Sequence, residues 1–228
     1  HVVYGVFGYK THAKMLMVLR REEHGYRRYV HLGTGNYHPR TTRFYTDFGL
    51  LTCNDEISSD VSDVFRQITG MGKVGELKHL WRAPFTLHSN ILAAIQAETD
   101  AAKAGRRGQI IAKMNSLLEP QVIEALYEAS QAGVAVDLIV RGVCGLRPGV
   151  KGLSDNIRVR SLVGRFLEHH RIFYFHAEGA EKLYLSSADW MERNFFRRIE
   201  IAFPVLDKKL KLRVMKEGLR PYLTDNCQ

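Results

Sequence analysis

The first fifty residues place apolar runs on either side of a charged segment, as β-strands joined by a hairpin do. Residues 2–7, 14–20 and 29–32 are mainly apolar, whereas residues 20–28 (RREEHGYRR) are charged around Gly25. Short apolar runs that flank a polar, glycine-containing segment are typical of paired strands. We therefore predict strands over the three runs, with the chain opening inside a strand, and a hairpin at the charged segment.

Apolar residues at helical spacing predict four helices. The first covers about 55–68, where Val61, Val64, Phe65 and Ile68 share one face and Gly70 and Gly72 follow. The others are expected at about 87–104, at about 120–132 and near 208–218. Residues 78–85, which include Trp81 and Pro84, are interpreted as a connection between two halves of the chain.

A strand, helix, strand pattern covers residues 109–140. A strand is predicted at 109–114, a helix at about 120–132 with Gly133 after its end, and a buried strand at 134–140 (VAVDLIV). Such a unit of about 30 residues predicts parallel pairing of its two strands. Further strands are predicted at 157–162, 171–175 and 182–185. The fold class is therefore α/β.

Composition restricts the partners of the protein. The 228 residues suit one large domain or two small ones. The formal net charge of +9 favours anionic partners, with phosphate first. The three cysteines, Cys53, Cys144 and Cys227, are too widely spaced for a disulfide framework or a C-x-x-C metal pair, which favours a reducing, cytoplasmic compartment. No apolar run reaches the roughly 18 residues of a membrane-spanning helix, and peripheral membrane association is left open.

Two segments of the chain match each other. The first contains His12, Lys14, the stretch 32–37 (LGTGNY), Arg40 and Asp47, and the second contains His169, Arg171, the stretch 185–190 (LSSADW), Arg193 and Glu200. The histidine and the acid are four residues further apart in the first segment than in the second. The whole of this difference falls between the histidine and the hydroxyl residue. One length change in the hairpin thus aligns both segments. We interpret the chain as a duplicated unit with domains 1–80 and 81–228.

Each repeat supplies a histidine and, two residues later, a cation. Side chains in a strand alternate, so His12 and Lys14 share a face. A neutral imidazole can attack phosphorus, and a neighbouring cation stabilises charge on the oxygens of the transferred group. Asp47 and Glu200 are candidates to fix the histidine tautomers, with an ordinary salt bridge to an arginine as the alternative. Tyr37 and Trp190, which align in the repeat, are interpreted as core residues, and Gly33 and Gly35 as either site or turn residues.

These motifs resemble the phospholipase D superfamily, in which two H-x-K repeats meet in one site. Its phosphodiesterases carry an Asp five residues after the lysine, where this chain has Leu19 and His176. Seven stretches in order resemble the long-chain bacterial polyphosphate kinases more specifically: KTHAKM (10–15), HLGTGNYH (31–38), YTD (45–47), KMNSL (113–117), DLIVRG (137–142), GRFLEHHRI (164–172) and SSADWM (186–191).

The resemblance implies two phospholipase D-like α/β units related by a pseudo-twofold axis, with mixed sheets flanked by helices. It implies reversible transfer of the ATP γ-phosphate to inorganic polyphosphate through a phosphohistidine. His12 matches the phosphorylated nucleophile. His169 matches the second site histidine, which contacts nucleotide phosphates and acts as an acid or base, and Tyr45 and Arg141 match positions that contact ATP. Within that scheme we expect Asp47 to orient the ring of His12 and Glu200 to orient that of His169.

The resemblance also implies Mg²⁺ as cofactor, with the associated residues upstream of His1, so that no metal site is expected in this chain. The first unit is then truncated, and the chain alone is expected to be a weak kinase. The implied partners are ATP and ADP, inorganic polyphosphate and further copies of the protein, and no nucleic acid.

The strand pattern agrees with a site at one sheet edge. Lys113 and Asn115 end one predicted parallel strand and Arg141 ends the next, at the edge where α/β sheets bind ligands. The arginines that suit an anion-binding groove are Arg165, Arg171, Arg193, Arg197 and Arg198.

Two alternatives stay open. A phosphodiesterase or nuclease of the same fold is disfavoured by the missing Asp at positions 19 and 176. A polyanion-binding module without catalysis would explain the charge but not the paired histidines.

Overall fold

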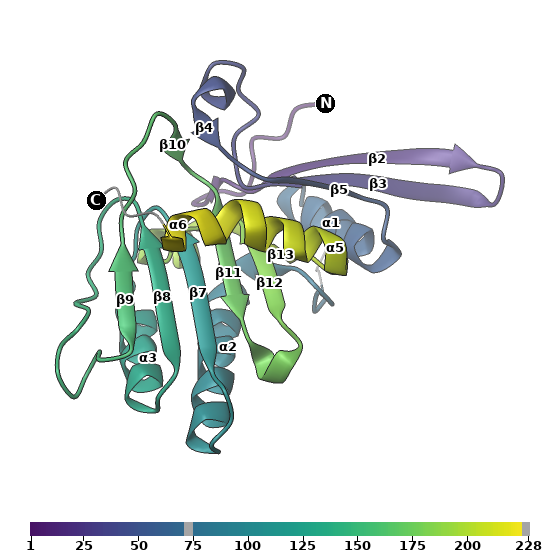
Figure 1. Cartoon of the computed structure of the whole chain (residues 1–228). Helices are drawn as coiled ribbons and strands as arrows, with labels where there is room; N and C mark the ends of the chain where they lie inside the picture. The colour runs from purple at the N-terminus through teal and green to yellow at the C-terminus, as the bar shows by residue number, and fades with distance from the viewer. Residues whose placement is uncertain (71–74, 225–228) are drawn as a thin grey trace.

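An eight-stranded mixed sheet forms the centre of the protein (Figure 1). The computed structural model describes residues 1–70 and 75–224. The strand order is β1-β13-β12-β11-β7-β8-β9, with β6 also paired to β13. The strands are β1 (Lys10–Thr11), β6 (Trp81–Ala83), β7 (Gln109–Met114), β8 (Ala135–Val140), β9 (Ile157–Arg160), β11 (Arg171–Phe175), β12 (Lys182–Ser186) and β13 (Arg198–Pro204). β7 and β8 are parallel, as predicted, and are joined by α3 (Pro120–Gln131).

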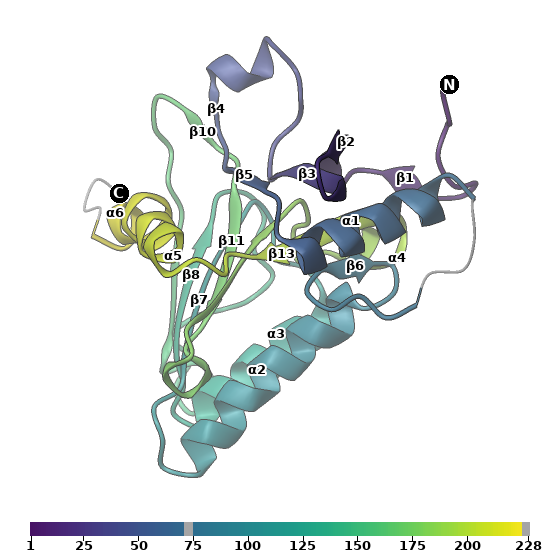
Figure 2. The same cartoon turned by 90° about the vertical axis from the view of Figure 1, so that its right-hand side faces the viewer.

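Helices cover both faces of this sheet, as Figure 2 shows. α2 (Leu87–Lys103) and α3 pack on one face, and α5 (Lys208–Val214) lies on the other, continuing through a π-helical turn, Met215–Leu219, into α6 (Arg220–Thr224). β11 is buried along its whole length because alternate side chains enter the two cores: Phe173 and Phe175 face α2 and α3, whereas Ile172 and Tyr174 face the opposite side.

A smaller antiparallel sheet carries the first repeat. It consists of β2 (Lys14–Glu22), β3 (Gly25–Gly33) and β5 (Gly49–Thr52). α1 (Asp55–Ile68) covers one of its faces through Val30, Leu32 and Val61. Asn54 caps this helix by accepting a hydrogen bond from the backbone N–H of Ile57 (3.0 Å). The β2–β3 hairpin extends away from the rest of the molecule (Figure 1).

Two short parallel pairings join the repeats. β1 pairs with β13 in a register that opposes Thr11 to Ile199. β4 (Tyr45–Thr46) pairs with β10 (Leu167–Glu168) in a register that opposes Thr46 to Glu168. Thr11 is followed by His12, and Ile199 is followed by Glu200. In the same way, Thr46 is followed by Asp47, and Glu168 is followed by His169. This shared geometry places His12 beside Glu200 and His169 beside Asp47.

Most predicted elements are confirmed, and three differ in the structure. Residues 2–7 form no strand, because no described strand pairs with them and Val2, Val3, Tyr4 and Phe7 are exposed. β2 and β3 continue through the charged segment to a turn at 23–24, since backbone pairing does not require burial. Residues 78–85 contain β6, which pairs with β13. Gly72 lies outside the described residues.

Further elements were not predicted from the sequence. They include β1, β4, β5, β10, β13 and the short helices α4 (Glu192–Phe196) and α6. No helix among the described residues is long and apolar enough to span a membrane.

Candidate active site

The two repeat histidines are each bound to the acid of the opposite repeat. Nδ1 of His12 lies 2.8 Å from Oε2 of Glu200. Nδ1 of His169 lies 2.9 Å and 3.1 Å from the two carboxylate oxygens of Asp47. The expected pairing of His12 with Asp47 and of His169 with Glu200 is therefore wrong. The parallel registers of β1 with β13 and of β4 with β10 are the physical cause of the exchange.

Hydroxyl residues that align in the repeat hold the two acids in place. Thr34 Oγ1 donates to Asp47 (2.7 Å), and Ser187 Oγ donates to Glu200. Glu200 is fully buried and accepts a third hydrogen bond from Nδ2 of Asn194 (2.8 Å). Each acid is thus fixed by its own repeat and bonded to the histidine of the other.

This arrangement sets the histidine tautomer. A carboxylate that already accepts hydroxyl and amide hydrogens can only accept from the imidazole as well, so Nδ1 carries the hydrogen and Nε2 keeps its lone pair. Burial alone would raise the pKa of Asp47, but hydrogen bonds from His169 and Thr34 and the charge of Arg171 outweigh it and hold that pKa below its usual value. Burial lowers the pKa of His169, with Asp47 opposing the shift. His169 is therefore a neutral imidazole at neutral pH.

The Nε2 atoms of the two histidines differ. Nη1 of Arg171 lies 3.0 Å from Nε2 of His169, and Asp189 holds this guanidinium at two points, at 3.2 Å and 3.1 Å. No hydrogen bond to Nε2 of His12 is found within residues 1–70 and 75–224. His12 therefore presents an open nucleophilic nitrogen, whereas that of His169 faces a cation.

Lys14 is the counterpart of Arg171 in the first repeat, and its surroundings are unlike those of the arginine. Its side chain is buried, with 5% exposed, and its Nζ has no hydrogen-bond partner in the described part of the chain. Burial lowers the pKa of Lys14 to about 8, with the charge of Glu200 opposing the shift. It lies within electrostatic reach of both Glu200 and Asp47. A buried, unpaired ammonium is unfavourable, so an anion that reached it would be bound strongly.

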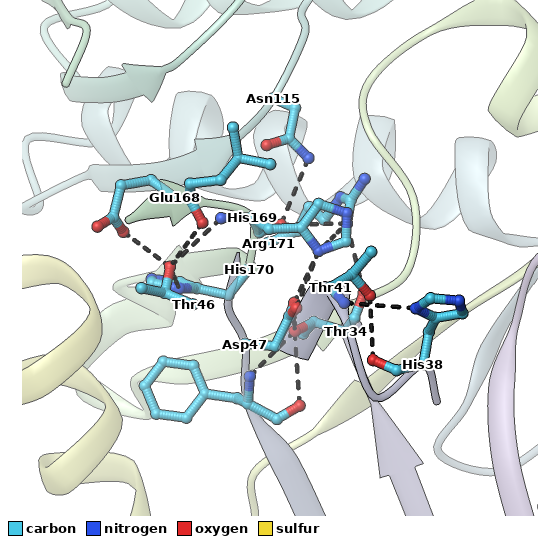
Figure 3. Close-up of polar contacts among 12 residues, drawn as sticks. Thr34, His38, Thr41, Thr46, Asp47, Asn115, Glu168, His169, His170 and Arg171 are labelled. Carbon is cyan, nitrogen blue, oxygen red and sulfur yellow. Dashed lines mark hydrogen bonds and ion pairs between the residues drawn. The ribbon is translucent and has the colours of Figure 1, made fainter. Parts of the chain in front are cut away.

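Arg141 and Asn115 lie beside His169, at the sheet edge where they were expected. Nε of Arg141 donates to Oδ1 of Asn115 (3.0 Å) and to the backbone carbonyl of Glu168 (3.1 Å). Nδ2 of Asn115 donates to the backbone carbonyl of His169 (3.3 Å), as Figure 3 shows. Tyr45 packs against the ring of His169, with 4.9 Å between the ring centroids. Arg141, Asn115, Tyr45 and His169 therefore share one edge of the site.

Other predicted residues take different places. Trp190 is buried, as expected for a core residue, but Tyr37 is 56% exposed and bonds His31 at 2.7 Å, so its interpretation as core is wrong. Arg198 lies 3.8 Å from Glu200, whereas Arg165, Arg193 and Arg197 are exposed. Sequence reasoning missed Asn194. The equivalent position in the first repeat is a threonine, Thr41, so the repeat carries no signal for it.

The described residues contain no cluster of metal-binding side chains. No group of three or more His, Cys, Asp or Glu side chains in residues 1–70 and 75–224 could hold a metal ion. The two site carboxylates are bonded to histidines and hydroxyls and lie near Lys14 and Arg171, whose charges oppose a bound cation.

Comparisons with known proteins agree on one family. The family models described as Polyphosphate kinase C-terminal domain 1 and domain 2 match residues 1–74 and 80–228. Curated polyphosphate kinases from Burkholderia ambifaria and Paraburkholderia phytofirmans are 65% and 62% identical over 99% of this chain, which covers 34% of each. The crystal structure of polyphosphate kinase from Porphyromonas gingivalis matches with a TM-score of 0.87 and 42% identity, over 92% of this chain and 33% of that one. This chain thus spans about a third of the length of these relatives, and it belongs to the polyphosphate kinase family.

Proposed function

We propose that this chain carries the phosphoryl-transfer site of an ATP:polyphosphate phosphotransferase, which moves the γ-phosphate reversibly between ATP and inorganic polyphosphate through a phosphohistidine. One observation carries the proposal. His12 has its Nδ1 on a buried carboxylate and its Nε2 open, in a site that also contains the unpaired ammonium of Lys14. The curated relatives are named polyphosphate kinase.

In the first step, Nε2 of His12 attacks the γ-phosphorus of ATP. The new N–P bond forms as the bond from phosphorus to the β,γ-bridging oxygen breaks, and ADP leaves. The imidazole becomes positively charged, and Glu200 stabilises it through the hydrogen bond at Nδ1. Lys14 stabilises the charge on the oxygens of the transferred group.

In the second step, a terminal oxygen of the polyphosphate chain attacks the same phosphorus. The O–P bond forms, the N–P bond breaks, and His12 returns to its neutral state. Both steps are displacements at phosphorus, and each can run backwards. The same residues therefore serve the transfer from polyphosphate to ADP.

In this proposal His169 contacts the phosphates of the nucleotide. Its lowered pKa keeps it neutral, and Arg171 at its Nε2 supplies a permanent positive charge for phosphate oxygens. Arg141 and Tyr45 adjoin it and complete the proposed contacts to ATP. The net charge of +9 suits both polyanionic substrates. The expectations that magnesium-associated residues lie outside this chain and that the protein is a homo-oligomer stay predictions.

A labelling experiment tests the proposal. The intact protein is exposed briefly to γ-³²P-labelled ATP and quenched in alkali, which preserves phosphohistidine. We expect acid-labile, base-stable label on His12, no label in His12→Ala, and normal label in His24→Ala, which changes an exposed histidine at the hairpin tip. Label on neither His12 nor His169 would remove the covalent mechanism, and cleavage of a phosphodiester without label would favour the phosphodiesterase.

A further inference from the structure

A buried polar cluster lies directly behind the site and has no part in the chemistry proposed above. Glu168 Oε2 accepts three hydrogen bonds, from the hydroxyl of Tyr222 (2.6 Å), from Oγ1 of Thr46 (2.9 Å) and from Nζ of Lys113 (3.2 Å). Nζ of Lys113 also donates to Nε2 of His170 (2.9 Å) and lies 4.3 Å from the centre of the Tyr222 ring. We call these five residues the anchor cluster.

Strand alternation connects the anchor cluster to the site. Residues 45–47 and 167–169 run side by side, and the side chains along each segment point in turn to opposite sides. Asp47 and His169 point into the site, whereas Thr46, Glu168 and His170 point into the cluster. Figure 3 shows Thr46 and Glu168 together, apart from Asp47 and the ring of His169. The backbone N–H groups of His169 and His170 also donate to the carbonyl of Thr46 (3.3 Å and 2.9 Å).

The charges within the cluster balance. Burial lowers the pKa of Lys113 to about 8, with Glu168 opposing the shift. Burial alone would raise the pKa of Glu168, but Tyr222, Lys113 and Thr46 outweigh it and hold that pKa below its usual value. Burial and the charge of Lys113 lower the pKa of His170 to about 4, so this ring is neutral. One cation and one anion therefore face each other, and each makes more than one hydrogen bond within the cluster, which makes a rigid support.

Tyr222 brings the C-terminal helix into this support. It lies on α6, after the end of the second repeat, and supplies the shortest hydrogen bond of the cluster. The cluster adjoins the His169–Asp47 pair, whereas Glu200, the partner of His12, is held by Ser187 and Asn194. A change at Tyr222 should therefore act on the nucleotide side of the site and leave the nucleophile in place.

We propose that Tyr222 is a positioning residue for the phosphoryl transfer, which acts through Glu168 and Thr46 on the His169–Asp47 pair. This inference rests on the function proposed above. Tyr222→Phe keeps the ring against Lys113 and removes only the hydroxyl, so Glu168 loses one of its three donors. We expect kcat/KM for ATP to fall about tenfold, in line with the loss of one hydrogen bond to a charged group, while the label on His12 still forms.

A double-mutant cycle in the intact protein tests the route of this effect. If Tyr222 acts through His169, Tyr222→Phe should lower kcat/KM about tenfold in the wild-type background and less than about twofold in the His169→Ala background. Glu168→Gln should likewise lower kcat/KM in the wild-type background and have little effect in the His169→Ala background. Tyr184→Phe is the matched control, because Tyr184 is half-buried and its hydroxyl makes no hydrogen bond among the described residues. We expect it to leave kcat/KM unchanged.

The outcomes separate the two proposals. Equal losses in both backgrounds, or no loss in the wild-type background, would overturn the positioning role of Tyr222 and leave the proposed function intact. A wild-type protein that forms neither phosphohistidine nor polyphosphate would overturn the proposed function, and the role of Tyr222 with it. Thermal unfolding of each variant shows whether a loss of activity reflects a loss of folded protein.

Discussion

Exchange of the two site carboxylates for amides gives the sharpest test of the crossed pairing. Glu200→Gln and Asp47→Asn each keep the shape of the side chain and remove its charge. In the structure Glu200 serves His12 and Asp47 serves His169. Glu200→Gln should therefore slow formation of the phosphohistidine even when ATP is saturating, whereas Asp47→Asn should weaken the binding of ATP and still let His12 take up label once ATP is saturating.

The structure sets the size of the expected loss. The bond from Nδ1 of His12 to Glu200 strengthens as the ring becomes positive, and hydrogen bonds to charged groups contribute about 1.5–3 kcal/mol, or roughly 10- to 100-fold in rate. If the amide introduced by Glu200→Gln turns its NH₂ toward Nδ1, the ring must adopt the other tautomer and lose the lone pair at Nε2. The same change in a Ser-His-Asp triad lowers kcat by about 10⁴. We therefore expect a loss of about 10² to 10⁴ for Glu200→Gln.

The assay is the rate of label incorporation from γ-³²P-labelled ATP, measured by rapid quench, followed by mapping of the labelled residue. Glu200→Gln should slow labelling of His12 by the factor given above. Asp47→Asn should lower steady-state turnover by up to about 10⁴, as the loss of a tautomer-fixing carboxylate does in a Ser-His-Asp triad, with label still found on His12 when ATP is saturating. The opposite result, with labelling lost in Asp47→Asn and kept in Glu200→Gln, would refute the crossed pairing.

Three further expectations concern single residues. His12→Ala should abolish both label and turnover, and His169→Ala should lower turnover by about 10² to 10⁴ while some label still accumulates; label mapped to His169 in the wild-type protein would reverse these roles. Because the pKa of Lys14 is lowered to about 8, its cation is present below that pH and is lost above it. We therefore expect kcat/KM to fall on the alkaline side, and Lys14→Arg to move this fall to higher pH. An unchanged pH profile in Lys14→Arg would contradict the role of Lys14. Asn115→Ala frees the guanidinium of Arg141 and should raise KM for ATP by about tenfold with a smaller change in kcat, and an unchanged KM would show that Asn115 does not position this arginine.

The hydrophobic pattern of a segment predicted those elements whose pattern does not depend on the rest of the fold. The helix at 55–68 and the strand at 171–175 were placed with the bounds that the structure has, because an amphipathic face and a short apolar run are properties of the segment itself. The run at 2–7 is equally apolar and forms no strand, since a strand also needs a partner edge.

Tertiary context decided the elements that the sequence did not predict. β1, β4 and β10 are two residues long, too short for any periodicity. They exist because segments more than 120 residues apart in the chain meet in parallel. The repeat therefore identified which residues belong to the site but not which acid meets which histidine, because Asp47 and Glu200 are chemically equivalent until these registers are known.

The repeats differ at one aligned position in a way that accounts for two unlike histidines. Asp189 of the second repeat aligns with Asn36 of the first. Asp189 holds Arg171 at two points and aims it at Nε2 of His169. Asn36 carries no charge and is exposed, so Lys14 has no carboxylate of this kind and keeps an unpaired Nζ. The carboxylate of Asp189 thus fixes Arg171 against Nε2 of His169. The amide of Asn36 does not fix Lys14, so Nε2 of the first histidine stays open in a site with an unpaired ammonium.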